Sequence, residues 1–176
     1  MAEVQPNTID RLEHMKFLIG RFDHYYDSVN NKGSFYIGIN TFILGGICVG
    51  FSNYCKNVQF GMCTYVVTIV LLITCFTSIF YTLSAMTPFL KISFGSNTDD
   101  SLISFGGIAK FEEVDFHSRF KDQTDNKIIE DYQNQIYTLS KGLNDKYKWL
   151  QQAGFFLTIE FITLIPLLSL LIYNLK

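Results

Sequence analysis

The sequence predicts an all-α membrane protein with three transmembrane helices, a cytoplasmic helical stalk and a short irregular or β-containing loop. Its 176 residues are 48% hydrophobic, and the apolar residues are concentrated in three blocks. Residues 33–55 and 57–90 carry no charge, and residues 149–175 carry only Glu160. Each block is long enough to cross a bilayer core, which takes about 20 helical residues.

Lysine and arginine residues are divided unequally between the segments that flank these blocks. Twelve lie in residues 1–33 and 91–148, whereas Lys56 and Lys176 are the two that lie elsewhere. Because basic residues concentrate on the cytoplasmic side of membrane proteins, we expect a multi-pass chain with the N-terminus and residues 91–148 in the cytoplasm. No short apolar core precedes a small-residue cleavage site near the N-terminus, so the first span is expected to direct insertion.

The overall charge restricts the class of partner. The net charge is -2, and fifteen of the 16 acidic residues lie on the same predicted side as the twelve basic ones. Such a mixed surface differs from a polybasic patch and argues against a nucleic-acid polymer as partner. We expect the lipid bilayer to be a partner of this chain.

Residues 1–32 are predicted to form a cytoplasmic amphipathic helix that begins near Thr8. Its apolar residues alternate by three and four, a heptad pattern that favours pairing with another helix along one seam. We expect this helix to continue into the first span without a break, with Lys32 as the last charge. The seam residues are Leu12, Met15, Ile19, Phe22, Tyr26 and Val29.

Residues 33–90 are predicted to hold transmembrane helices 1 and 2, joined by the outer loop 52–64. Gly46 and Gly50 form a GxxxG step that allows close helix approach. The step fits packing against the other spans and a seam between two copies equally well. Asn40 lies in mid-span, where its amide needs a partner, most simply on a neighbouring helix.

The second span is predicted over about Tyr65 to Ala85, and Pro88 fixes its exit. Two of the four cysteines, Cys55 and Cys63, share the outer loop. Their spacing fits no zinc pattern, and a disulfide between them requires an oxidising exterior.

Residues 91–150 are predicted to be a cytoplasmic loop and helix, followed by transmembrane helix 3 over residues 151–176. Residues 91–95 and 101–111 are expected to be extended around a turn, and a short helix is expected within 112–120. A helix is expected from about Asp125, paired in parallel with the N-terminal helix as the stalk. Its heptad residues, with Lys146 as an interruption, are Ile129, Tyr132, Ile136, Leu139, Leu143 and Leu150.

No catalytic or metal-binding pattern is present in the sequence. His14, His24 and His117 fit no metal-ligand motif, and no phosphate-binding glycine loop or nucleophile elbow occurs. We therefore predict a protein that is not an enzyme and has no cofactor. Glu160 is the exceptional residue, because an ionisable group within a span favours a functional role. Alternatively, it lies near the interface or is protonated and bonded to a Ser or Thr of the second span.

Three motifs in fixed order carry a resemblance to a known family. They are Arg21-Phe-Asp with Tyr26-Asp-Ser-Val-Asn-Asn-Lys32-Gly-Ser before the first span, Ser104-Phe-Gly-Gly-Ile108 in the loop, and Asp131-Tyr-Gln-Asn-Gln-Ile136 with Leu139-Ser140 and Lys146-Tyr147 before the last span. This set resembles the transmembrane effectors of the Pycsar antiphage systems.

The resemblance implies an effector of antiphage defence and abortive infection. It would respond to a cyclic pyrimidine mononucleotide, cyclic UMP or cyclic CMP, made by a partner cyclase. It would then disrupt the cell inner membrane, and we expect a homo-oligomer.

The ligand site is predicted where the paired helices meet the membrane. Lys32 and Lys146 would bind the cyclic phosphate. The alternative is that both lysines are interface anchors paired with Asp27 or Asp145. The other predicted ligand residues are Asn31, Asn134 and Gln135, which could read a base edge, and the aromatic residues Tyr26, Phe105 and Tyr147, which could stack on the base.

Two other classes of function compete with a ligand-gated effector. One is a constitutive small pore or holin-like protein that uses Asn40 and Glu160, and the other is a non-catalytic membrane scaffold. A neighbouring nucleotide cyclase gene would favour the effector, whereas toxicity on expression alone would favour the pore.

Overall fold

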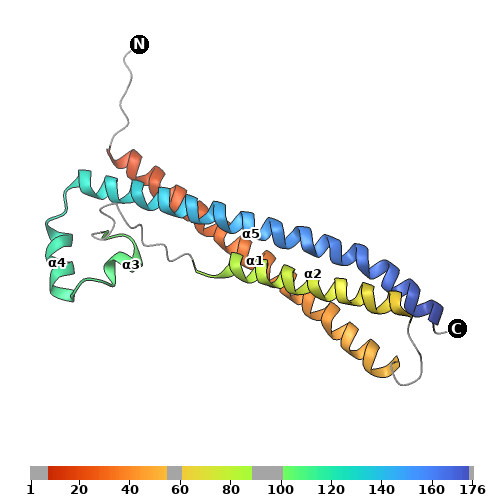
Figure 1. Cartoon of the computed structure of the whole chain (residues 1–176). Helices are drawn as coiled ribbons and strands as arrows, with labels where there is room; N and C mark the ends of the chain where they lie inside the picture. Colours follow the sequence, from red (N-terminus) through yellow and green to blue (C-terminus); the bar gives the residue numbers. More distant parts are fainter. Residues whose placement is uncertain (1–7, 55–60, 89–100, 175–176) are drawn as a thin grey trace, which may run out of the picture. The chain divides into compact units, whose positions relative to one another are not determined.

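The computed structural model describes residues 8–54, 61–88 and 101–174, and every regular element in them is an α-helix (Figure 1). Three long helices and two short ones follow one another along the chain. They are α1 (Thr8–Tyr54), α2 (Met62–Met86), α3 (Phe105–Ile108), α4 (Glu113–Lys121) and α5 (Asp125–Asn174).

The helices α1, α2 and α5 are each long and apolar enough to cross a membrane, so the structure contains a candidate helix for each of the three predicted spans. Large apolar side chains are exposed on their outer faces, among them Phe42, Phe76 and Ile162. Such apolar faces are compatible with the hydrocarbon core of a bilayer, because exposing them to water would cost free energy and contact with lipid does not.

The chain divides into two compact units. The loop unit comprises Met1–Asp27 and Pro88–Asn144, and the bundle unit comprises Ser28–Thr87 and Asp145–Lys176. Both α1 and α5 contribute residues to each unit without a break in the helix.

The bundle unit has its apolar core where three helices meet. Ile43 of α1, Leu71 and Cys75 of α2, and Leu167 of α5 form one buried cluster. Along α2 the buried residues recur every three or four positions, as a seam between helices requires. Most of them are small and polar, which allows backbones to approach closely inside a membrane.

Glycine permits the closest helix contacts of the bundle unit. A Cβ atom at Gly33 would lie 2.7 Å from the Met86 sulfur, so α1 and α2 approach each other there. A Cβ atom at Gly154 would lie 3.1 Å from the Tyr36 hydroxyl oxygen, so α1 and α5 approach each other there. Neither contact belongs to the predicted GxxxG step.

The GxxxG step itself faces open space among the described residues. Nothing lies within 4 Å of the position of a Cβ atom at Gly46 or Gly50. Packing of this step within the chain therefore has no support in the structure, and a seam between copies stays a prediction.

The loop contains helix where extended structure was expected. Residues 101–111 hold α3, so the extended piece predicted there is wrong, whereas a short helix does follow as α4. The Ser101 and Ser104 side chains bond to nearby backbone N–H groups, and such local bonds favour a capped helical turn over a strand. The extended piece predicted at residues 91–95 lies outside the described residues.

Candidate functional site

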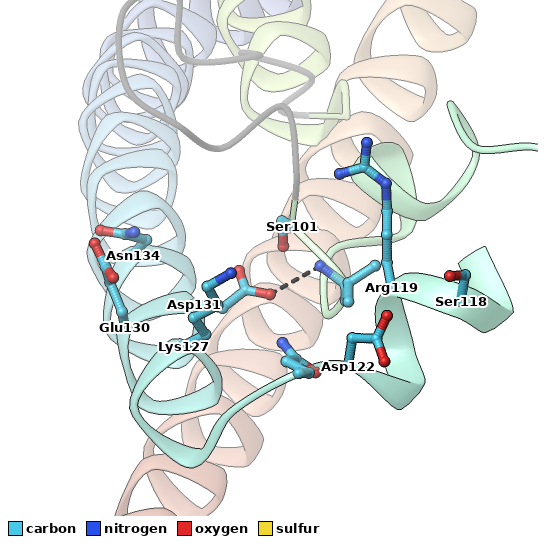
Figure 2. A pocket seen from close by; sticks show the side chains of 10 residues that line it. Ser101, Ser118, Arg119, Asp122, Lys127, Glu130, Asp131 and Asn134 are labelled. Atoms are coloured by element: carbon cyan, nitrogen blue, oxygen red, sulfur yellow. Dashed lines mark hydrogen bonds between the residues drawn. The ribbon is translucent and has the colours of Figure 1, made fainter. Parts of the chain in front are cut away.

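A pocket of about 520 Å³ lies in the loop unit (Figure 2). Its volume falls within the range of small-molecule sites, roughly 300–1,000 Å³. The beginning of the described loop, α4 and the first turns of α5 form its walls. The lining residues are Ser101, Leu102, Ser118, Arg119, Asp122, Gln123, Lys127, Glu130, Asp131 and Asn134.

Asp131 of α5 attaches the loop to the pocket wall. Its carboxylate accepts a hydrogen bond from the Leu102 backbone N–H at 2.8 Å, which is the dashed line in Figure 2. The Ser101 hydroxyl oxygen accepts a second bond, from the Ser104 backbone N–H at 3.1 Å. These two bonds fix the backbone of residues 101–104 beside α5.

Gly107 allows the backbone to pass close to Ser101, which lines the pocket. Its N–H donates to the Ser104 hydroxyl oxygen at 3.1 Å, which caps α3. A Cβ atom at Gly107 would lie 2.5 Å from the Ser101 carbonyl oxygen, a distance that real side chains do not show. The position therefore requires glycine for space.

The pocket brings cations and amides together on two helices. The Arg119 guanidinium of α4 lies over the Phe111 ring, 4.8 Å from its centroid, a cation–π arrangement that orients it. Lys127 of α5 supplies a second cation, and Figure 2 shows Asn134 on the same wall. Such a set can bind a phosphate through the cations and a base edge through the amides.

Three carboxylates share the pocket with these cations. Asp122, Glu130 and Asp131 can each accept hydrogen bonds from hydroxyl or N–H groups of a ligand. The pocket therefore suits a ligand that combines one anionic group with several donors, and it disfavours a polyanion.

The predicted ligand residues are divided between the two units. Tyr26, Phe105, Asn134 and Gln135 belong to the loop unit, whereas Asn31, Lys32, Lys146 and Tyr147 belong to the bundle unit. Of this set, Asn134 lines the pocket. Neither unit alone contains the predicted site. The pocket residues Arg119 and Lys127 were missed because they belong to no motif in the sequence, and Asp131 was part of a family motif but was not predicted to bind the ligand.

Tyr26 has a structural contact in the loop unit. Its hydroxyl donates to the Leu139 carbonyl oxygen at 3.0 Å, which connects α1 and α5 there. Burial, and then the charge of Asp23, raises the pKa of Tyr26, so the hydroxyl remains a donor at neutral pH. Phe105, a second predicted stacking residue, is 77% exposed and lies outside the pocket lining.

Lys146 is buried at the end of α2. Only 6% of the residue is exposed, and its ammonium donates to the carbonyl oxygens of Ala85 at 2.6 Å and Thr87 at 2.7 Å. The carboxyl end of a helix carries partial negative charge, so a cation is stabilising there. The two carbonyl bonds compete with the predicted phosphate contact of Lys146, and its alternative role as an interface anchor stays a prediction.

A second polar site lies within the bundle unit. The Asn40 amide nitrogen donates to the Tyr36 carbonyl oxygen at 2.9 Å and to the Ser78 hydroxyl oxygen at 3.1 Å, so it bonds to a neighbouring helix as expected. Ser78 donates in turn to the Ala153 carbonyl oxygen at 3.3 Å. Glu160 is fully buried among the helices, and its carboxyl lies beside Ser78, a serine of the second span.

The cysteines give the predicted disulfide no support. Cys63 is an exposed free thiol, and Cys55 lies outside the described residues. A bond between them stays a prediction for an oxidising exterior.

A family model described as the Pycsar effector protein domain matches residues 14–173. The chain belongs to this family. The match confirms the resemblance carried by the sequence motifs and includes the pocket and the apolar parts of all three candidate spans. No match was found among curated proteins or among solved structures.

Family membership and the three spans together establish this Pycsar effector as a membrane protein of antiphage defence. The family is one of membrane effectors and not a known catalytic family. Membership also implies a cyclic-nucleotide signal made by a partner cyclase.

Proposed function

We propose that this Pycsar effector binds a cyclic pyrimidine mononucleotide in the loop-unit pocket and then disrupts the inner membrane. The proposal rests on the pocket itself, whose lining includes the cations Arg119 and Lys127 and the amide of Asn134. A cyclic monoester has one negative charge, and a nucleoside supplies hydroxyl and base donors. This combination matches a lining of cations, amides and carboxylates.

Each wall of the pocket has a proposed role in binding. Arg119 and Lys127 hold the phosphate, Asn134 reads the pyrimidine edge, and Glu130 accepts a bond from the ribose hydroxyl. This assignment replaces the predicted phosphate role of Lys146, whose ammonium is bonded to the end of α2.

Binding would affect the spans through α5. A ligand shifts a conformational equilibrium only by binding one state more tightly than another. The pocket walls come from α4 and α5, so a ligand that bridges them favours the state in which they are close. Because α5 continues into the bundle unit as one helix, a shift of its first turns can reach the spans.

We place the protein in the inner membrane with its N-terminus inside. The unequal division of basic residues supports this orientation, with residues 1–32 and 91–150 in the cytoplasm beside a cytoplasmic messenger. We also propose a homo-oligomer in which the Gly46–Gly50 step forms the contact between copies. The GxxxG pattern and the open space beside both glycines support this contact.

Calorimetry on the purified protein in nanodiscs tests the trigger. Arg119→Ala should weaken binding of cyclic UMP or cyclic CMP at least tenfold, since charge-assisted bonds to a phosphate contribute about 1.5–3 kcal/mol. Arg21→Ala is the matched control, because Arg21 is an exposed arginine that bonds to Tyr25 and lies outside the pocket. The amount of inserted protein should be equal in both variants.

Two further variants locate the site if the result differs. Full binding in both Arg119→Ala and Lys127→Ala would reject the pocket. Loss of binding in Lys32→Ala alone would instead return the site to the membrane end of the paired helices. Membrane damage in cells that lack any cyclase would favour a constitutive pore over a triggered effector.

A further inference from the structure

The bundle unit has polar groups inside and apolar groups outside. The outward face of α2 exposes Val66, Ile69, Val70, Ile73, Phe76, Phe80 and Leu83. The inward polar groups, which we call the polar seam, are Thr64, Thr68, Cys75, Ser78 and Thr82 of α2, Asn40 of α1 and Glu160 of α5. Small polar residues also serve helix packing in membranes, so the seam needs a further observation before it implies a function.

That observation is the state of three buried oxygen atoms. Neither carboxyl oxygen of Glu160 forms a hydrogen bond of ordinary geometry, although Cys75 and Ser78 lie beside it. The Asn40 amide oxygen also has no hydrogen-bond partner. Both residues have no exposed surface, and buried polar groups without partners are rare unless a site is used by water, an ion or a proton.

The surroundings of Glu160 favour the neutral acid. A buried ionised carboxylate requires a cation or several hydrogen-bond donors. The titratable group that faces it from α2 is the Cys75 thiol, and α1 contributes the uncharged Asn40 amide. On α5 itself, residues 149–175 contain no other charge. A proton on the carboxyl is the simplest way to remove the charge.

Ser78 lies beside two of the residues that have unsatisfied groups, Asn40 and Glu160. Its hydroxyl accepts a bond from the Asn40 amide, donates to the Ala153 carbonyl oxygen, and lies beside the Glu160 carboxyl. These two bonds fix the orientation of the Ser78 hydroxyl, so this hydroxyl holds its place beside the Glu160 carboxyl. In the described residues, no group of three or more His, Cys, Asp or Glu side chains could hold a metal ion, which favours a proton over a divalent cation.

We propose that the polar seam is a path for protons across the membrane, with Glu160 as the group that binds and releases the proton and Ser78 as a positioning residue. In the closed bundle the Glu160 carboxylic acid keeps its proton. When the seam hydrates, the acid gives this proton to water on one side and takes one from water on the other. Each cycle moves one proton and restores the acid. The opening step rests on the proposed function.

Proton flux into vesicles of phosphatidylethanolamine and phosphatidylglycerol tests the path. A trapped pH-sensitive dye reports the flux after cyclic UMP or cyclic CMP is added to the reconstituted protein. Glu160→Gln preserves the shape of the side chain and should reduce the triggered flux at least tenfold, with nucleotide binding unchanged by calorimetry. Equal flux in this variant and the wild type would overturn the proposal.

A pair of serines on α2 provides a matched test if Glu160→Gln does not insert. Ser78→Ala should reduce the flux at least tenfold, whereas Ser84→Ala should leave it unchanged, because Ser84 is not among the buried residues of α2 and its hydroxyl donates to the Phe80 carbonyl oxygen of its own helix. Equal flux in the two variants would overturn the role of Ser78 and the path through it. Nucleotide binding by the wild type without any proton flux would overturn the path and leave the trigger intact.

Infrared spectroscopy tests whether Glu160 is protonated and needs no nucleotide. Its result therefore remains informative even if the proposed trigger is wrong. At neutral pH the wild type should show the C=O stretch of a protonated carboxylic acid. The band should be absent in Glu160→Gln and present in Glu113→Gln, whose carboxyl is exposed on α4 and does not line the pocket. A wild type without the band would overturn the proposal.

Discussion

Lys146 occupies an inward position on α5 that apolar residues fill on either side. Leu143 and Leu150 are buried three and four residues away, so the heptad continues through the lysine. The charge is tolerated because two carbonyl oxygens at the end of α2 accept its hydrogen bonds. A charged residue in a heptad thus marks a specific contact here and does not interrupt the seam.

Removing the Lys146 ammonium should destabilise the bundle unit. Lys146→Met keeps much of the volume but leaves the Ala85 and Thr87 carbonyl oxygens without this donor. The expected loss is about 1–3 kcal/mol in the free energy of unfolding, the usual cost of buried unsatisfied groups. Denaturant unfolding in detergent micelles measures it.

The neighbouring Lys148 provides the control for this measurement. It is exposed and lies 3.8 Å from Asp145, and such surface pairs contribute little. Lys148→Met should therefore leave the free energy of unfolding nearly unchanged. Equal effects of the two substitutions would show that the carbonyl bonds of Lys146 are unimportant for stability.

At the scale of elements, the short helix α3 depends on side chains that bond to the backbone. The Ser104 hydroxyl caps it, Gly107 leaves room for the Ser101 carbonyl oxygen, and Asp131 holds the preceding residue Leu102. Hydrophobic periodicity is absent over four residues, so the helix was not predictable from pattern alone. Its Ser and Gly residues were the available signal, since they are typical of caps and close contacts.

Adjacent glycines in α3 allow a matched test of the pocket wall. Gly107→Ala would place a Cβ atom 2.5 Å from the Ser101 carbonyl oxygen, whereas a Cβ atom at Gly106 meets nothing within 4 Å. Overpacking of this kind costs about 1–3 kcal/mol. We expect Gly107→Ala to weaken nucleotide binding at least tenfold by calorimetry and Gly106→Ala to leave it unchanged. Unchanged binding in both variants would show that the conformation of α3 has no effect on nucleotide binding.

At the scale of the whole molecule, two units share the helices α1 and α5. The bundle unit contains the apolar parts of all three spans, and the loop unit contains the pocket and most of the charged residues. This division separates a part suited to lipid from a part suited to an aqueous ligand. The orientation of the spans in the membrane is predicted from the distribution of Lys and Arg residues.

Reporter fusions test that orientation. An export-dependent reporter fused after Lys56 should be active, and the same reporter fused after Lys110 should be inactive, because twelve of the fourteen basic residues are predicted to stay inside. The reverse result, activity after Lys110, would place the pocket outside the cell. It would also exclude a cytoplasmic messenger as its ligand.

The three candidate spans, the spacing of apolar residues in α1 and α5 and the family could all be predicted from the sequence. Each depends on residues that are close in the chain: uncharged runs set the span length, and spacing by three and four sets the buried face. Asn40 and Glu160 were identified in this way because a polar group in hydrocarbon is costly wherever it lies.

Which groups meet could be learned from the folded structure but not from the sequence. The bonds of Lys146 to Ala85 and of Ser78 to Ala153 join residues 61 and 75 positions apart, and the pocket joins a loop to two helices. Local periodicity carries no information about such pairs, because they depend on how helices are placed against one another. From the sequence, Lys146 was therefore predicted to bind a ligand, and Arg119, Lys127 and Ser78 were not identified. Their contacts became visible in the folded structure.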